Sequence, residues 1–133
     1  MNKRINQHLP SLFLRLALTV TLLSAVADRF GLWGTKSAWG NWHNFQVYTR
    51  QLTFFLPQSI SMVCGYAATF LEIVFALLLL IGFKTRYVAS FTGLLLLLFA
   101  LAMSISLGIK STLDYSVWVG SAASFLLAQG QER

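Results

Sequence analysis

Residues Ile60–Gly82, ISMVCGYAATFLEIVFALLLLIG, decide the fold of this chain. The run is long enough to cross a bilayer, because about 20 apolar residues rising ~1.5 Å each span the ~30 Å hydrocarbon layer. Glu72 lies near its middle and is the only charged residue between Arg50 and Lys84. A carboxylate at that depth costs at least ~2.5 kcal/mol on insertion scales, so such residues usually face a bundle interior and mark function. The run therefore predicts a membrane protein with one costly internal acid.

The composition supports a lipid environment for the whole chain, which we treat as a single integral membrane domain, 1–133. Of its 133 residues, 56% are hydrophobic and 11% are charged, whereas a soluble domain carries about 25% charged residues. The net charge is +6, but the cations flank apolar runs, as they do in membrane proteins. We therefore expect no nucleic-acid binding. The single cysteine, Cys64, excludes an intrachain disulfide or a CxxC pair, and no metal site is predicted.

Four apolar runs predict an all-α membrane protein, because helices satisfy every backbone group within lipid. We expect four transmembrane helices in an antiparallel bundle, over about 11–30, 60–82, 87–109 and 113–128. The fourth run is the shortest and carries Asp114 at its start. The first run also resembles a cleavable signal peptide, with Lys3 and Arg4 before it and Ala25-Val26-Ala27 near its end. Arg15 and the length of the run favour a membrane span instead.

The positive residues suggest an orientation in the membrane. The compact Lys84-Thr85-Arg86 loop is the strongest signal, because short loops dominate the positive-inside bias. We therefore predict that both termini are cytoplasmic. Arg15, Lys84 and Arg86 are predicted to anchor the protein at the membrane surface, with the side chain of Arg15 extending to the inner headgroups.

The loop over residues 31–59 is too long to be a passive connection. It is rich in tryptophan and phenylalanine, and Trp42, Phe45, Tyr48 and Leu52 lie near helical spacing before Pro57. We predict a short helix lying on the outer membrane face. Two interpretations of the loop stay open: an aromatic belt without a ligand, or a lid over the mouth of the bundle.

Small residues mark the faces on which the helices should meet, since helices in lipid associate through small and polar residues. Glu72 shares such a stripe with Ser61, Gly65, Ala68 and Ala76. Arg15 lies almost opposite the stripe of its own helix, which comprises Ala17, Thr21, Ser24 and Asp28. Glu72 is therefore expected to be unpaired and protonated at neutral pH. Thr21, Ser24 and Ser104 are its predicted hydrogen-bond partners.

Eight residues are predicted to bind a ligand in this bundle or in a polar vestibule at its outer mouth. They are Glu72, Asp28, Ser24, Thr69, Ser104, Asp114, Trp42 and Tyr48. Glu72 is also the one candidate for a catalytic group. Ordinary interfacial charges are the alternative interpretation of Asp28 and Asp114.

Several short motifs resemble the DoxX family of membrane proteins: Arg15-Leu16-Ala17-Leu18, Ala27–Gly34, Trp39-Gly40-Asn41-Trp42, Phe45 and Tyr48 before Pro57, Ala68-Thr69 ahead of Glu72, Gly82–Arg86 and Ser106–Ser116. The resemblance covers residues 12–128. It implies a four-helix, multi-pass protein of the bacterial-type inner membrane, with a functional acid at Glu72 and a loop cation at Arg86. Some members of that family resemble partners in membrane redox or thiol-stress complexes.

Three functions compete on these grounds. A non-catalytic binding or scaffold subunit of a membrane complex would use Glu72 as a buried polar anchor, and small-residue seams also suit a homo-oligomer. A membrane subunit of a quinone- or thiol-linked oxidoreductase would use Glu72 toward a proton or a quinone, with partner proteins of a redox complex supplying any electron carrier. A small-solute or proton transporter would suit the acid, but the chain lacks an inverted repeat. Quinone is the one cofactor considered, and whether the chain is an enzyme stays open.

Overall fold

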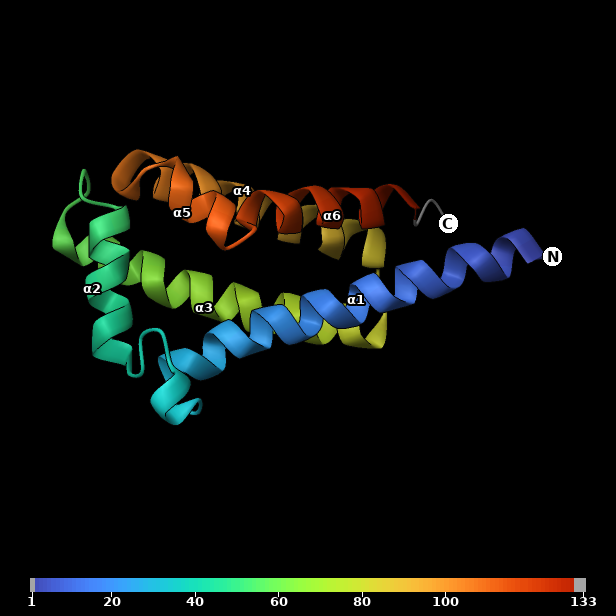
Figure 1. Ribbon diagram of the computed structural model, residues 1–133. Coiled ribbons are helices and arrows are strands. Elements are labelled where there is room, and N and C mark those ends of the chain that lie inside the picture. The colour runs from blue at the N-terminus through green and yellow to red at the C-terminus, as the bar shows by residue number, and fades with distance from the viewer. Residues whose placement is uncertain (1, 131–133) are drawn as a thin grey trace.

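The computed structural model describes residues 2–130, and the side chains of residues 9–129. The described chain consists of helices: α1 (Asn2–Arg29), the 3-10 helix η1 (Gly34–Lys36), α2 (Trp42–Leu52), α3 (Gln58–Ile81), α4 (Thr85–Leu107), α5 (Ile109–Asp114) and α6 (Val117–Gly130) (Figure 1). α1 packs along α3, and α4 packs along α6. The start of α1, the end of α6 and the α3–α4 turn lie at one end of the molecule, as the sequence predicts.

Within the part of the chain that the structure describes, three helices are long and apolar enough to cross a membrane: Leu9–Arg29, Gln58–Ile81 and Thr85–Leu107. The prediction of a membrane protein built from helices is thus confirmed, but the prediction of four full spans is wrong. α6 has 14 residues, which is about 21 Å of helix and less than the ~30 Å hydrocarbon layer.

The fourth predicted span fails because the chain turns at Gly108, just before this span, and again at Ser116, within it. α4 ends at Gly108, whose φ of 93° suits glycine, and Ser116 has a φ of 57° between α5 and α6. The turn is held by Thr112, which is fully buried and whose Oγ1 accepts a hydrogen bond from Trp118 Nε1 at 2.8 Å. Residues 113–116 therefore belong to a corner, although their hydropathy continues that of α6.

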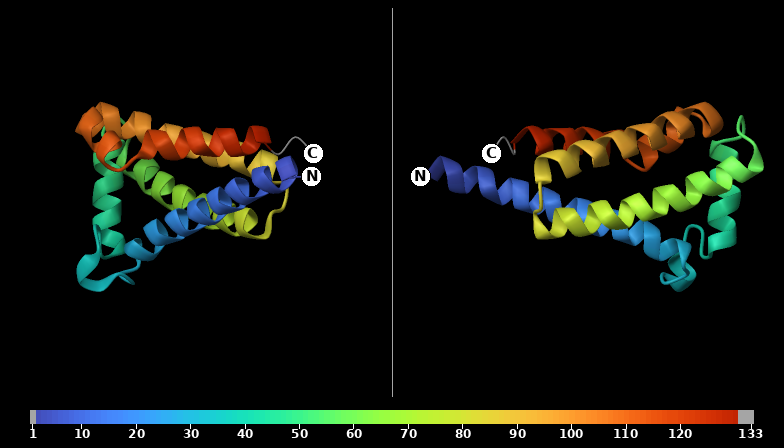
Figure 2. Two further views of the ribbon diagram at one scale, coloured as in Figure 1. Left: turned by 45° about the vertical axis from the view of Figure 1, so that its right-hand side comes forward. Right: turned by 180° about the vertical axis from the view of Figure 1, so that it is seen from behind.

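α2 confirms the predicted short helix in the long loop. The side chain of Asn41 caps it by accepting a hydrogen bond from the backbone N–H of Asn44 at 2.8 Å. α2 lies across the end of the bundle rather than along it (Figures 1 and 2). α2 packs against α3 at Gly65, where an added Cβ would make ordinary van der Waals contact with Phe45 and Thr49 of α2.

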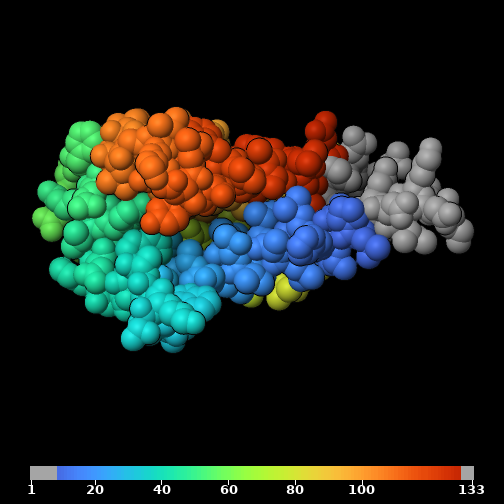
Figure 3. Space-filling model, viewed as in Figure 1, coloured from blue at the N-terminus to red at the C-terminus, as the bar shows by residue number. Residues whose placement is uncertain are grey.

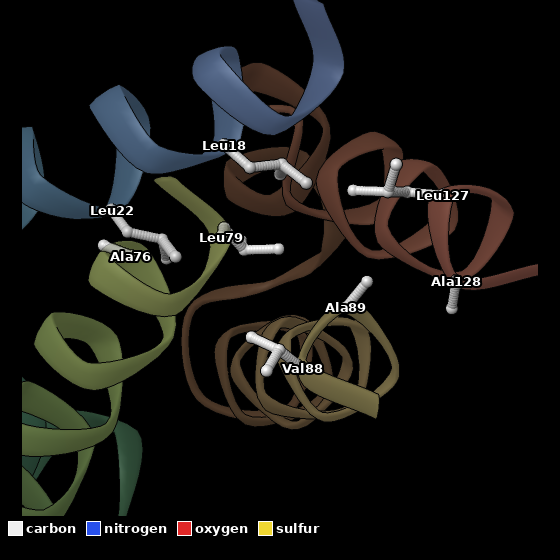
Figure 4. Close-up of a cluster of buried hydrophobic side chains, with 8 residues drawn as sticks. All are labelled: Leu18, Leu22, Ala76, Leu79, Val88, Ala89, Leu127 and Ala128. Carbon is white, nitrogen blue, oxygen red and sulfur yellow. The ribbon is translucent and has the colours of Figure 1, made fainter. Parts of the chain in front are cut away.

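The bundle has a narrow end and a wide end. At the narrow end a hydrophobic cluster joins four helices (Figure 4); it comprises Leu18, Leu22, Ala76, Leu79, Val88, Ala89, Leu127 and Ala128. From there α1 diverges from α6 until α2 closes the gap at the wide end (Figure 2). Many large apolar side chains remain exposed, among them Phe13, Phe70 and Ile105, as expected of helices that face lipid.

Candidate functional site

A buried ion pair joins α1 to α3 at the wide end. Arg29, the last residue of α1, places Nη1 2.6 Å from Oε2 of Glu72. Both residues are 2% exposed. The same Nη1 donates a hydrogen bond to Thr69 Oγ1 at 2.8 Å, and Thr69 donates to the carbonyl of Gly65. The expectation of an unpaired Glu72 is therefore wrong, because the guanidinium of Arg29 lies beside its carboxyl group; the protonation of Glu72 stays a prediction.

The predicted partners of Glu72 are wrong for the same reason. Glu72 takes Arg29 instead of Thr21, Ser24 or Ser104. Sequence reasoning missed Arg29 because this residue lies at the end of an apolar run, where positive side chains usually face the membrane interface. The helical spacing of Leu22, Val26 and Arg29, all buried, is the signal that places Arg29 on an inward stripe.

Aromatic rings enclose the other side of the Arg29 guanidinium. Its Cζ lies 3.9 Å from the ring centroid of Phe45 and 5.4 Å from that of Trp39, and these two rings meet edge to face at 5.1 Å. Such cation–π contacts stabilise a desolvated guanidinium. Among the described residues, Nε of Arg29 has no hydrogen-bond partner, and Oε2 of Glu72 accepts no well-directed hydrogen bond. The pair thus retains unused hydrogen-bonding capacity.

Asp28 binds the loop backbone, whereas the adjacent Arg29 pairs with Glu72. Its carboxylate accepts backbone hydrogen bonds from Ala38, Trp39 and Gly40 at 2.7–2.9 Å. The loop can return this closely because Gly31 faces the carbonyl oxygen of Gly40, which would lie 2.8 Å from an added Cβ. Asp28 therefore holds Trp39 in place over Arg29. It is neither a free vestibule carboxylate nor an ordinary interfacial charge.

A cavity of about 450 Å³ occupies the wide end. Its walls come from α1, the loop, α2, α3, α4 and the α5–α6 corner, with apolar side chains such as Leu52, Leu96, Phe99 and Met103. Of the predicted binding residues, four contribute to the walls: Ser24, Asp28, Tyr48 and Glu72. Burial raises the pKa of Tyr48 above its ordinary value, and the neighbouring Tyr115 adds a smaller effect in the same direction. The Tyr48 hydroxyl therefore stays protonated at neutral pH and can donate a hydrogen bond.

The remaining predicted binding residues do not line the cavity. Trp42 stacks on Phe30 and contacts Tyr66, with ring centroids 5.8 and 5.0 Å apart. Asp114 forms an exposed ion pair with Lys110 at 2.6 Å. The buried hydroxyl of Ser104 has no hydrogen-bond partner among the described residues. Thr69 accepts a hydrogen bond from Arg29 and does not itself line the cavity.

The sequence predicts that Arg15 does not pair with Glu72, and this is confirmed: the half-buried Arg15 side chain bonds to the end of α3 instead. It donates hydrogen bonds to the carbonyls of Leu79 and Leu80, at 3.0 and 3.2 Å, and so satisfies the last turn of α3. Lys84 and Arg86 are exposed. The anchoring role of these three cations stays a prediction.

These features define a class: a multi-pass helical membrane protein with an internal ion pair beside a cavity at one end. Within the described residues, no three His, Cys, Asp or Glu side chains come together as metal ligands would. The family model described as "Methylamine utilisation protein MauE" matches residues 7–114. The chain belongs to the MauE family. No curated protein and no solved structure matches it.

The family match corrects the resemblance to DoxX proteins, which is wrong. The motifs that carried it are small-residue stripes, tryptophans at a helix exit and a glycine-to-arginine turn. Small residues at helix contacts and aromatic or positive residues at the membrane interface are general features of helical membrane proteins, so different families can share such motifs. The match extends through α5 and ends before α6, and it therefore includes Arg29, Glu72 and most of the cavity wall.

Proposed function

We propose that the protein is a non-catalytic binding subunit of a membrane oxidoreductase system, one used in methylamine utilisation as the family name indicates. Its ligand is a neutral, largely apolar molecule that carries an acceptor oxygen, and a quinone ring is the best fit. The observation that carries this proposal is the cavity of about 450 Å³ with the Arg29–Glu72 pair in its wall.

The size and lining of the cavity support a small organic ligand. Binding sites for such molecules commonly measure ~300–1,000 Å³, with apolar walls and a few polar groups that fix orientation. Trp39, Phe45 and Phe99 offer flat apolar surfaces for a ring. The Tyr48 hydroxyl is a hydrogen-bond donor among the residues that line the cavity, and it suits a carbonyl oxygen of a quinone.

The charges in the wall support a neutral ligand. Glu72 balances the charge of Arg29, and three backbone N–H groups satisfy Asp28. A charged ligand would have to break one of these arrangements, at a cost of several kcal/mol for a buried pair. A neutral ligand leaves both arrangements intact.

The test is the binding of a tail-less benzoquinone to the full chain in lipid nanodiscs. Ala68→Phe fills the cavity and should weaken binding at least ten-fold. The matched control is Ala67→Phe on the adjacent position of α3, which is exposed and outside the cavity; it should bind as the wild type does. Equal binding by both variants, or no binding by the wild type, would overturn the proposal.

A second measurement separates binding from catalysis. The purified protein alone should not reduce the bound quinone when a thiol reductant is supplied, because a binding subunit leaves electron transfer to its partners. Steady turnover that Glu72→Gln abolished would instead support the oxidoreductase alternative.

A further inference from the structure

The cavity is not closed, and its opening has a defined position. Three residues that line the cavity are themselves exposed: Thr21 of α1, Ala38 of the loop and Tyr115 between α5 and α6. The opening therefore lies between α1 and the α5–α6 corner. In the space-filling view these two parts, blue and orange, leave a hollow between them in which side chains behind them are seen (Figure 3).

The opening reaches into the depth of the bilayer. Thr21 precedes Arg29 by eight residues, which is about 12 Å along the helix axis. Both belong to the Leu9–Arg29 segment that is long and apolar enough to cross a membrane. Val20, next to Thr21, is 65% exposed and faces outward. The surroundings of the opening at this depth are lipid chains rather than water.

We infer that the ligand carries a hydrocarbon tail and that it enters sideways from the bilayer, with its ring in the cavity and its tail leaving between α1 and the α5–α6 corner. This inference rests on the proposed function. A wholly enclosed ligand would need no opening at membrane depth. A water-soluble one would need an opening at the aqueous end, where Ala38 is the one exposed residue among those of the loop and α2 that line the cavity.

The experiment uses a benzoquinone with a ten-carbon tail and a photoreactive diazirine at its last carbon. The full chain in phosphatidylcholine nanodiscs is irradiated, and labelled residues are located by mass spectrometry with and without an excess of the same quinone lacking the diazirine. Labelling that the excess quinone removes should concentrate at Thr21, Tyr115 and Val117. It should fall at least five-fold in Thr21→Trp and stay unchanged in Val20→Trp.

The controls keep each result informative. Thr21 and Val20 are both exposed, so each tryptophan variant should fold and elute from size-exclusion chromatography as the wild type does. Thr21→Phe tests the same obstruction of the opening with a smaller aromatic ring. Equal labelling in the two tryptophan variants would overturn the inference, as would labelling only of enclosed wall residues such as Leu52. If the labelling failed but the tail-less quinone still bound to the wild type and bound more weakly to Ala68→Phe, the proposed function would hold without this inference. A photoreactive phospholipid that labelled the inner wall and was not displaced by quinone would also overturn the inference, since a structural lipid would then fill the cavity.

Discussion

The interior of the bundle is packed differently at its two ends. At the narrow end, alanines and leucines from four helices meet directly, and Ala76, Leu79 and Ala89 are fully buried. At the wide end, α2 lies between the diverging helices, and a charged pair and a cavity occupy the interior. The comparison indicates that stability is concentrated at one end, while the other end is free to hold a ligand.

The largest expected effect comes from removing one charge at the wide end. Arg29→Met should destabilise the protein by about 3–5 kcal/mol, because Glu72 would remain buried without its partner. Unfolding in mixed micelles with rising dodecyl sulfate measures this change. The double variant Arg29→Met/Glu72→Met should recover most of the loss. A double variant no more stable than the single one would show that the pair does not act as a unit.

Two leucines compare packing at the two ends. Leu79→Ala at the narrow end should cost about 2–4 kcal/mol, because Leu79 is fully buried among close neighbours. Leu52→Ala at the wide end should cost roughly half as much, since one side of the Leu52 side chain already borders an open cavity. The same unfolding assay measures both. Equal costs would contradict the division into a packed end and an open end.

Two glycines provide a smaller contrast. A Cβ at Gly93 would lie 3.0 Å from the Phe125 ring between α4 and α6, whereas one at Gly65 would meet α2 at 3.5 Å or more. Gly93→Ala should cost about 1–2 kcal/mol, and Phe125→Leu should relieve that cost. Gly65→Ala should stabilise by about 0.5 kcal/mol, because alanine favours a helix over glycine. The reverse order in thermal unfolding would show that the α2–α3 contact is the tighter one.

The smallest effect is expected at the exposed ion pair of α5. Lys110→Ala should change stability by less than about 0.5 kcal/mol, because exposed i,i+4 pairs contribute little. Unfolding of Lys110→Ala and Asp114→Ala, beside Arg29→Met, compares an exposed pair with a buried one. A loss comparable to that of Arg29→Met would mean that the α5 corner, rather than the interior, holds the wide end together.

The sequence predicts much of the fold and part of the site. The apolar runs place α1, α3 and α4, because length and hydropathy act locally, and the spacing of Trp42, Phe45 and Tyr48 predicts α2. Glu72 on an inward stripe is confirmed by its burial. The fourth span is wrong because Thr112 and Ser116 form a corner that hydropathy does not detect.

The sequence by itself determined that this chain belongs in a membrane and that one carboxylate must lie inside it, since both follow from the number and spacing of apolar and charged residues. Only the tertiary structure decided which charge meets Glu72. Arg29 stands 43 positions earlier, and the two meet because α1 and α3 pack side by side and the Asp28-bound loop covers the contact. The cavity, too, exists only because α1 diverges from α6 beneath α2 (Figure 2).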